Sequence, residues 1–167
     1  TTRPSSPSLF RPTSGHPIRI QPYLADLISA PRHVVAPDLG RRLRVASYNV
    51  HRWTGVRGGR AYAPEKVQRV LGELNADVLA LQEVLRPFER PDPLAAIAHD
   101  FGFHLAFVVT RHHKRGELGN AVLSRWPLSG AVVIDLTFGR LERRAALAVQ
   151  ISSATRRLQV AATHLAL

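Results

Sequence analysis

The polar and apolar residues of this chain follow two different periods, and the change from one to the other predicts where strands and helices lie. In LRVASYNVH, the alternation predicts a strand with Val45, Ser47 and Asn49 on one face. The stretch DVLALQEV is apolar almost throughout, which is typical of a strand buried on both faces. We expect further strands in FHLAFVVT, NAVLSR, AVVIDL, AALAVQIS and RLQVAATHL.

Two segments place their apolar residues at helical spacing. The first, APEKVQRVLGELNAD, has Pro64 in its first turn, a position that proline tolerates. Its apolar stripe consists of Val67, Val70, Leu71 and Leu74. The second, PDPLAAIAHDFG, has Asp92 as N-cap, Pro93 as its first helical residue and Gly102 as its stop. The order strand, helix, strand, helix and then strands only predicts an α/β (α+β) fold with a mixed sheet.

Residues 1–43 differ in composition from the rest of the chain. They hold seven of the 12 prolines, with serine, threonine and arginine between them. Such a segment has few large apolar residues to bury, so we expect a mostly irregular, extended arm with one helical turn at YLADLISA. The expected organisation is therefore a Pro- and Arg-rich arm (1–43) followed by one folded region (44–167).

The composition adds a strong positive charge. The formal net charge is +11, and 21 of the 23 basic residues are arginine. Arginine pairs bidentately with phosphate, so the charge favours a phosphate-bearing partner, although a GC-rich genome produces the same bias. No apolar run reaches the ~18 residues of a membrane helix, so we expect a soluble protein without a transmembrane segment. The lack of cysteine excludes thiolate metal sites and leaves the compartment open, with the cytoplasm slightly favoured.

Four polar residues stand where a core strand or its end is usually apolar: Asn49, Glu83, Arg144 and His164. Each has an ordinary explanation alone, as a turn cap, a first solvated residue, a surface charge and a satisfied core histidine. Together, an amide, a carboxylate, a guanidinium and an imidazole at one edge of a sheet suit phosphate-ester chemistry with a divalent cation. Sequence spacing alone leaves open whether the four residues converge.

Five stretches resemble, in order and spacing, the endonuclease/exonuclease/phosphatase superfamily: VASYNVH, DVLALQEV, GNAVLSRWP, ERRAAL and ATHLAL. The resemblance covers residues 44–167 and is nearest to the small bacterial metal-dependent hydrolases of that group. It implies a phosphoester or phosphodiester hydrolase of the nuclease or phosphodiesterase type, with Mg²⁺ as cofactor and Mn²⁺ as its alternative. The rival hypothesis is a non-catalytic phosphate- or nucleic-acid-binding module derived from the same family.

The same resemblance assigns roles to the matching residues. It implies that Glu83 is a direct Mg²⁺ ligand and that Asn49 lies beside the metal and the scissile phosphate. Arg144, rather than Arg143, is implied to bind the phosphate of the substrate. His164 is implied to hydrogen-bond a phosphate oxygen and to help stabilise the transition state.

Other polar residues are weaker candidates. Asn120 in GNAVLSR is expected to shape a turn near the site, and His51 at its rim has no assigned role. In RWTGVRGGR, Arg57 and Arg60 are as consistent with a plain surface loop as with phosphate binding. The histidines of RHHKRGE fit a solvated loop better than a zinc site.

The resemblance is incomplete, because the family's later Gly-Asp-x-Asn and Ser-Asp-His stretches do not occur in the sequence. The family architecture is a four-layer α-β-β-α sandwich. We therefore expect this chain to form its N-terminal half, roughly one mixed sheet with helices on the outer face. The other face of that sheet would be bare, so we expect a missing C-terminal half to cover it, or self-association through it. The substrate stays open among DNA, RNA, phospholipid head groups and inositol phosphates.

Overall fold

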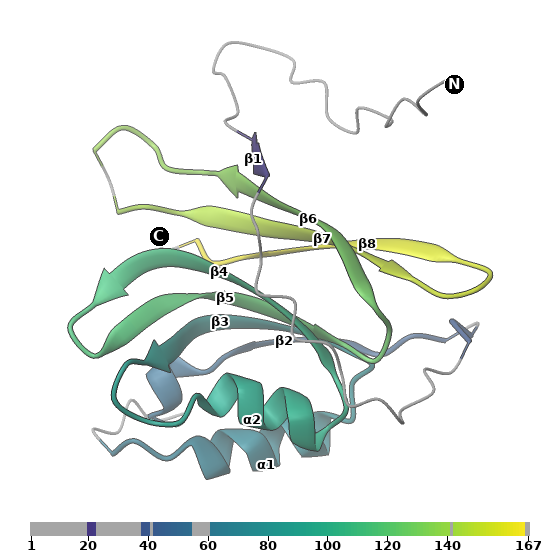
Figure 1. The fold of residues 1–167 in the computed structure, drawn as a ribbon, viewed down its shortest axis with the longest axis horizontal. Helices are drawn as coiled ribbons and strands as arrows, with labels where there is room; N and C mark the ends of the chain where they lie inside the picture. Colours follow the sequence, from purple (N-terminus) through teal and green to yellow (C-terminus); the bar gives the residue numbers. More distant parts are fainter. Residues whose placement is uncertain (1–19, 23–37, 41, 55–60, 141, 166–167) are drawn as a thin grey trace.

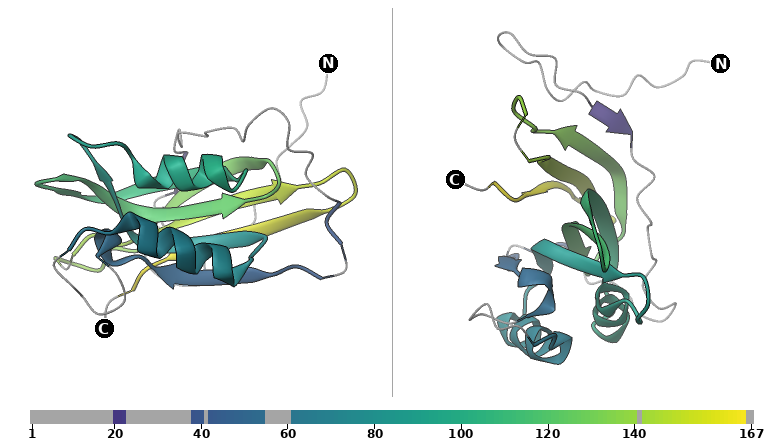
Figure 2. Two further views of the ribbon diagram at one scale, coloured as in Figure 1. Left: turned by 90° about the horizontal axis from the view of Figure 1, so that it is seen from below. Right: turned by 90° about the vertical axis from the view of Figure 1, so that its left-hand side faces the viewer.

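The computed structural model describes residues 20–22, 38–40, 42–54, 61–140 and 142–165. Within them, two four-stranded sheets pack face to face, and two α-helices cover the outer face of one sheet (Figure 1). Figure 2 shows the helices on one side of this sheet and the second sheet on the other. The α/β fold expected from the sequence is confirmed, as is a mixed sheet with helices on its outer face.

The mixed sheet has the strand order β2-β3-β5-β4. Its strands are β2 (Val45–Asn49), β3 (Val78–Pro87), β5 (Gly116–Ser124) and β4 (His104–His113). The pair β2 and β3 is parallel, a pairing that needs a crossover such as the helical one between these strands, and the other pairs are antiparallel. Asn49, the last residue of β2, pairs with Gln82 in the middle of β3, so the end of β2 lies next to Glu83, which is inside β3 rather than at its end.

The helices are α1 (Pro64–Leu74) and α2 (Pro93–Asp100). The side chain of Asp92 caps α2, because its Oδ1 accepts a hydrogen bond of 2.9 Å from the backbone N–H of Leu94. Both helices bury apolar residues against the mixed sheet. Leu74 departs from the expected stripe: it is 40% exposed, and the chain leaves the helix at the next residue, Asn75, in a left-handed conformation.

The second sheet is antiparallel throughout and has the order β1-β6-β7-β8. Its strands are β1 (Ile20–Pro22), β6 (Leu128–Asp135), β7 (Ala145–Ser152) and β8 (Arg157–Thr163). Three of these four strands match segments in which strands were expected. The fourth, β1, lies in the proline-rich region.

This second sheet corrects the expectation that the chain supplies one sheet with a bare inner face. A second apolar core fills the space between the sheets. Its fully buried residues include Val78, Val122, Leu147 and Ile151. The segments DVLALQ and LQVAATHL lie in different sheets and face each other across this core. Alternation shows which residues of a strand point inward, but long-range pairing decides which strands share a sheet.

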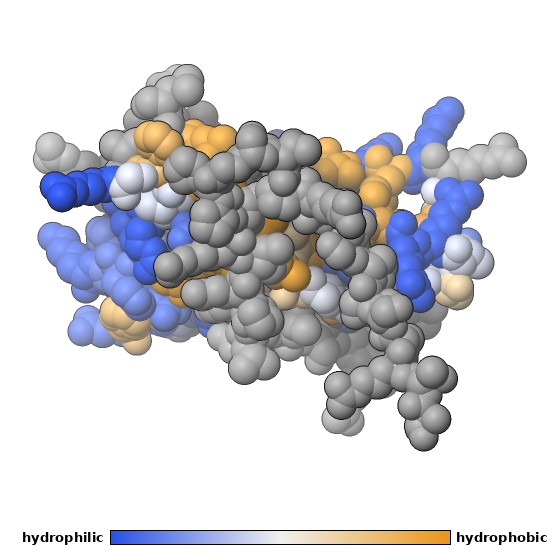
Figure 3. Space-filling view, turned by 90° about the horizontal axis from the view of Figure 1, so that it is seen from above, coloured by the Kyte–Doolittle hydropathy of each residue, from blue (hydrophilic) through white to orange (hydrophobic). Residues whose placement is uncertain are grey.

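Some described residues on the outer side of the second sheet are exposed. Figure 3 views the molecule from this side and shows hydrophobic groups between hydrophilic ones toward the two ends. In β8, Gln159 and Ala161 are exposed. A further partner for this chain, whether a missing C-terminal half or a second copy, remains a prediction.

Most of the expected arm, including the helical turn at YLADLISA, lies outside the described residues. Two described parts of it contact the second sheet: β1 pairs with β6, and Leu39 is 6% exposed in the core between the sheets. The loop that carries Arg57 and Arg60 is also outside the described residues. None of the described helices is long and apolar enough to span a bilayer.

We predict that Gly119→Ala destabilises the fold, because a Cβ at this position in β5 would lie 1.8 Å from the carbonyl oxygen of Val108. Overpacking of this kind costs roughly 2–3 kcal/mol in the free energy of unfolding. Gly72→Ala in α1 is the control: its Cβ would meet Phe101 at 3.6 Å. That change should stabilise the helix by about 1 kcal/mol. Urea unfolding of both variants tests the pair, and equal stability of Gly119→Ala and wild type would contradict the packing.

Candidate active site

A bulge in β3 places Glu83. The register of β3 against β5 shifts between Leu81 and Val84, and Glu83 has a φ of 50°. The backbone N–H of Val50 donates a hydrogen bond of 3.0 Å to the carbonyl of Gln82 and so holds the bulge from the side of β2. Because a bulge breaks the alternation of side chains, it directs Glu83 toward the edge of the sheet where β2 also ends.

Asn49 is the last residue of β2 and contacts Glu83 directly. Its Nδ2 donates a hydrogen bond of 3.0 Å to Glu83 Oε1. Its Oδ1 accepts a hydrogen bond of 2.9 Å from the backbone N–H of His51. With both ends of the amide used, the Asn49 side chain has one orientation, and it fixes one oxygen of the Glu83 carboxylate.

The short turn η1 (His51–Trp53) brings two basic side chains to the same carboxylate. His51, Arg52 and Trp53 all have positive φ values, 46°, 57° and 66°, a conformation that is rare outside glycine. The fully buried Trp53 anchors the turn, since its indole N–H donates to the carbonyl of Leu85 at 2.6 Å. As a result, His51 Nδ1 lies 3.7 Å and Arg52 Nε 3.8 Å from Glu83 Oε2.

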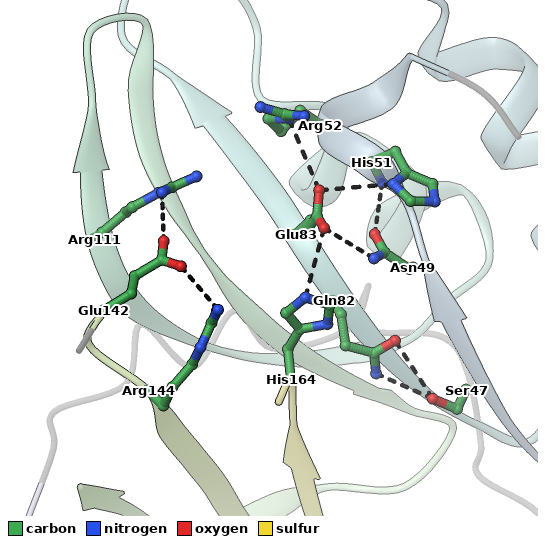
Figure 4. A network of polar contacts seen from close by, with 10 residues as sticks. All are labelled: Ser47, Asn49, His51, Arg52, Gln82, Glu83, Arg111, Glu142, Arg144 and His164. Carbon is green, nitrogen blue, oxygen red and sulfur yellow. Dashed lines mark hydrogen bonds and ion pairs between the residues drawn. The ribbon is translucent and has the colours of Figure 1, made fainter. Parts of the chain in front are cut away.

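The second sheet contributes His164, which follows β8. Its Nε2 lies 3.5 Å from Glu83 Oε1, so three segments distant in sequence meet at one carboxylate (Figure 4). His164 is 28% and Glu83 24% exposed, so both side chains keep access to solvent. The contact requires the two sheets to be packed as they are.

A second polar group lies across the same hollow. Arg144 Nη2 donates a hydrogen bond of 2.8 Å to Glu142 Oε2, and Arg111 of β4 bonds the other oxygen of that carboxylate (Figure 4). A single carboxylate thus bridges two guanidinium groups, one from each sheet. The hollow between this group and Glu83 has a volume of about 200 Å³. Its lining includes Arg52, Glu83, Thr110, Arg111, Asn120, Glu142, Arg144 and His164.

The surroundings of Glu83 keep it ionised. Partial burial alone would raise the pKa of this carboxyl. The hydrogen bond from Asn49 and the positive charges of His51, Arg52 and His164 act in the opposite direction and prevail, so the pKa is lowered below its ordinary value of 4.5. An anionic oxygen pair is therefore present in the hollow at neutral pH.

The donors of the hollow fit a hard divalent cation only in part. Glu83 supplies a carboxylate, the ligand type that Mg²⁺ prefers, whereas Asn49 turns its nitrogen toward Glu83 and its oxygen toward the N–H of His51. Within the described part of the chain, no three His, Asp or Glu side chains gather closely enough to form a metal cage. Mg²⁺ is commonly held by one or two carboxylates, with waters and substrate phosphate completing the shell. The residues present are consistent with that mode of binding.

The structure brings together most of the residues singled out from the sequence. Asn49, Glu83 and His164 contact one another, and Arg144 lines the same hollow while paired with Glu142. Asn120 is a correction: it lies inside β5 rather than at a turn. It is 2% exposed, and its Nδ2 donates to the carbonyl of Ala145 at 3.1 Å, which joins the two sheets beside the hollow.

Sequence reasoning gave no role to Arg52, Arg111 and Glu142, which line the hollow, or to His51, which contacts Glu83. His51 and Arg52 come shortly after the strand end at Asn49, and that position was the available signal. Arg111 lies in a stretch that appeared to be a solvated loop, and the structure places it within β4. Its pairing with Glu142 crosses 31 residues and two sheets, so no local pattern indicates it.

The chain is similar to proteins of one known family in sequence and in structure. Residues 46–160 match the model of the Endonuclease/Exonuclease/phosphatase family, which confirms the resemblance inferred from the sequence motifs. No curated protein matches the chain. Among solved structures, an endonuclease/exonuclease/phosphatase from Beutenbergia cavernae is 27% identical, with a TM-score of 0.58. The match covers 74% of this chain and 38% of that one.

Two further structures share the fold. A family protein from Leptotrichia buccalis has a TM-score of 0.60 at 16% identity, with 75% of this chain and 55% of that chain covered. TDP2 from Caenorhabditis elegans has a TM-score of 0.52 at 19% identity, with 74% and 35% covered. The chain therefore spans between about a third and just over half of the length of these relatives.

We predict that the contribution of Glu83 to stability depends on pH. A carboxyl with a lowered pKa in the folded state stabilises the fold above its ordinary pKa of 4.5, and this stabilisation is lost as the pH falls through the lower folded pKa. Glu83→Gln should therefore be less stable than wild type at pH 7, and the difference in stability should shrink as the pH falls below 4.5. Chemical unfolding at several pH values measures this. If the difference in stability between wild type and Glu83→Gln stays constant with pH, the charge of Glu83 is not the cause of that difference.

Proposed function

The chain belongs to the Endonuclease/Exonuclease/phosphatase family, and from this premise we propose that it carries part of the active site of a Mg²⁺-dependent phosphoester hydrolase. Members of this family are typically metal-dependent phosphoesterases. The observation that carries the proposal is that Glu83, Arg144 and His164 line one hollow and that Asn49 is hydrogen-bonded to Glu83 there. Asn49 and Glu83 belong to the mixed sheet, whereas Arg144 precedes β7 and His164 follows β8 of the second sheet.

Glu83 would hold the cation, with Asn49 at its side. The carboxylate is ionised and partly exposed, and its position is set by the backbone bulge rather than by a flexible loop. A Mg²⁺ ion bound there would polarise the phosphoryl group and offset negative charge as it develops. Asn49 orients one carboxylate oxygen through its 3.0 Å hydrogen bond. The fold arranges these groups before substrate binds, so they need no reorganisation during the reaction.

His164 and Arg144 would act on the phosphate itself. His164 Nε2 is 3.5 Å from Glu83 Oε1, so a phosphate oxygen bound next to that carboxylate comes within reach of the imidazole. Arg144 lines the opposite wall of the hollow and offers a planar guanidinium, which suits the non-bridging oxygens of a phosphate. Donors on both sides of the phosphate stabilise the charge that accumulates on its oxygens.

Because the chain spans little more than half of these relatives at most, we propose the activity for the whole protein to which this site belongs. Among the described residues, the second carboxylate of the hollow is Glu142, and it is engaged by two arginines. The group that activates water is therefore left unassigned. A non-catalytic phosphate-binding module is the competing function, and the first experiment below separates the two.

We predict that Glu83→Gln lowers Mg²⁺-dependent hydrolysis by at least about 100-fold, because an amide is a weaker ligand for a hard cation. The assay is hydrolysis of bis(p-nitrophenyl) phosphate with Mg²⁺ or with EDTA, accompanied by Mn²⁺ binding measured by electron paramagnetic resonance. Glu73→Gln, an exposed change on α1, is the matched control and should behave as wild type. Mn²⁺ binding that survives Glu83→Gln would disprove the ligand assignment. Phosphate binding in EDTA without any hydrolysis would favour the non-catalytic module.

A separate prediction concerns Glu142, whose carboxylate occupies the two guanidinium groups that a phosphate would use. Glu142→Gln should raise the affinity for inorganic phosphate by roughly two- to fivefold, the range expected for an exposed ion pair. Arg144→Gln should lower it. Calorimetric titration with phosphate measures both, with Glu73→Gln again as control. Weaker binding in Glu142→Gln would mean that Glu142 orients Arg144 rather than competes with the ligand.

A further inference from the structure

A second hollow lies at the same end of the mixed sheet, where β3 leads into α2 and where β4 turns into β5. Its volume is about 180 Å³, close to that of the first hollow. Its polar and aromatic lining consists of Tyr62, Phe88, Glu89, Arg90, Lys114 and Arg115. We call this set the aromatic-basic hollow.

Phe88 is the first unusual feature of this hollow. Its ring is 66% exposed, although large aromatic side chains are normally mostly buried. Its backbone is held in place, because its N–H donates a hydrogen bond of 3.2 Å to the carbonyl of Arg115. An exposed ring on a backbone that is held in place contributes little to the core and offers a flat surface for stacking.

The charge of the hollow is the second feature. Arg90, Lys114 and Arg115 are exposed, and within the described part of the chain none of them forms an ion pair with a carboxylate. Arg90 instead lies over the ring of Tyr62, 5.3 Å from its centre. Glu89 is the single carboxylate in the lining. The hollow therefore combines an open aromatic face with uncompensated positive charge.

The aromatic-basic hollow lies near the proposed active site along the same strands, although the two hollows share no lining residue. Glu83 and Pro87 lie four residues apart on β3, a distance of roughly 13 Å at the usual rise of a strand. Leu85 of this hollow pairs in the sheet with Leu118 of the first hollow. The pKa of His113 is affected by basic residues of both hollows. Burial lowers this pKa, and the charges of Arg115, Arg52, Arg111 and Lys114 lower it further.

We propose that the aromatic-basic hollow binds a single-stranded nucleic acid, with one base stacked on Phe88 and the backbone phosphates near Lys114 and Arg115. The substrate of the neighbouring site would then be a phosphodiester within that strand, an assignment that rests on the proposed function. Stacking platforms next to basic grooves are the means by which proteins hold single strands without reading their sequence. The roughly 13 Å between the hollows is spanned by a few nucleotides.

A membrane surface fits these features less well. Insertion into a bilayer needs a broad apolar face, whereas Phe88 is a single exposed ring in a concave setting with Glu89 beside it. A small phosphate ester would use the cations but not the ring. The combination of ring and cations over a length of several residues is specific to a polymer that carries both bases and phosphates.

The test is the binding of a fluorescein-labelled single-stranded oligothymidylate, followed by fluorescence anisotropy in EDTA so that no hydrolysis occurs. Phe88→Ala should weaken binding by roughly five- to 150-fold, the loss expected for one stacked base. Phe88→Trp should restore it, because the aromatic face returns. Phe138→Ala is the matched control, since Phe138 is also exposed (74%) but lies on the β6–β7 connection. Equal binding by wild type and Phe88→Ala, or an equal loss in Phe138→Ala, would overturn the proposal.

The charges are tested by salt dependence. The double variant Lys114→Gln/Arg115→Gln should reduce the slope of log affinity against log salt by about 1.4, since each phosphate contact on a single strand contributes about 0.7. Arg156→Gln/Arg157→Gln, at the β7–β8 turn on the opposite end of the molecule (Figure 1), should leave the slope unchanged. An equal change of slope in both double variants would mean that the overall charge of the protein attracts the strand, and it would overturn the proposed site.

These measurements separate the failure of the inference from the failure of the proposed function. Oligonucleotide binding is measured in EDTA, so it does not require the cation that Glu83 is proposed to hold. Binding that depends on Phe88, without any Mg²⁺-dependent hydrolysis, would support the inference and remove the enzymatic function. Mg²⁺-dependent hydrolysis of the strand that is unchanged in Phe88→Ala would support the enzymatic function and overturn the inference. Vesicles of phosphatidylserine and phosphatidylcholine that bind through Phe88, in place of the oligonucleotide, would assign the hollow to a membrane and overturn the proposal.

Discussion

The contact of one carboxylate, Glu83, with groups from two segments that are distant in the sequence is the constraint on which the rest of this structure depends. A carboxylate that is partly buried must be compensated, because burial alone disfavours its charge. Asn49, His51 and Arg52 compensate it from the end of β2 and the turn that follows, and His164 does so from the other sheet. Two irregular backbone features, the β3 bulge and the left-handed turn, exist at the points where these side chains must be directed inward.

The same requirement explains why two sheets are needed for one site. The mixed sheet alone would present Glu83 with Asn49 on a flat edge, open to water. Packing of the second sheet closes the hollow, and the cross-links beside it keep the sheets in register. Asn120 bonds the backbone of β7 at Ala145, and Glu142 bridges guanidinium groups from both sheets. The apolar core between the sheets therefore stabilises the fold and sets the distances across the site.

The sequence predicted what local patterns determine and missed what depends on long-range pairing. Asp92 capped the expected helix because N-capping is decided within four residues. Asn49, Glu83 and His164 were identifiable because each is a polar residue at a predicted strand end. The second sheet was not predicted, since alternation in AVVIDL and AALAVQIS is equally compatible with either sheet. The link between Arg111 and Glu142 was missed for the same reason, because no spacing rule connects a residue of β4 with one in the connection between β6 and β7.

The balance of charge in the hollow indicates how the site and its surroundings work together. In the structure, two carboxylates, Glu83 and Glu142, satisfy the basic groups that line the hollow. A phosphate placed between them brings negative charge of its own, and it can take over the guanidinium groups that Glu142 occupies. Under the proposed function, Glu83 would then bind a cation, which would offset the charge that the phosphate adds. Each of these ion pairs would in that case hold a ligand position in place before the ligand binds.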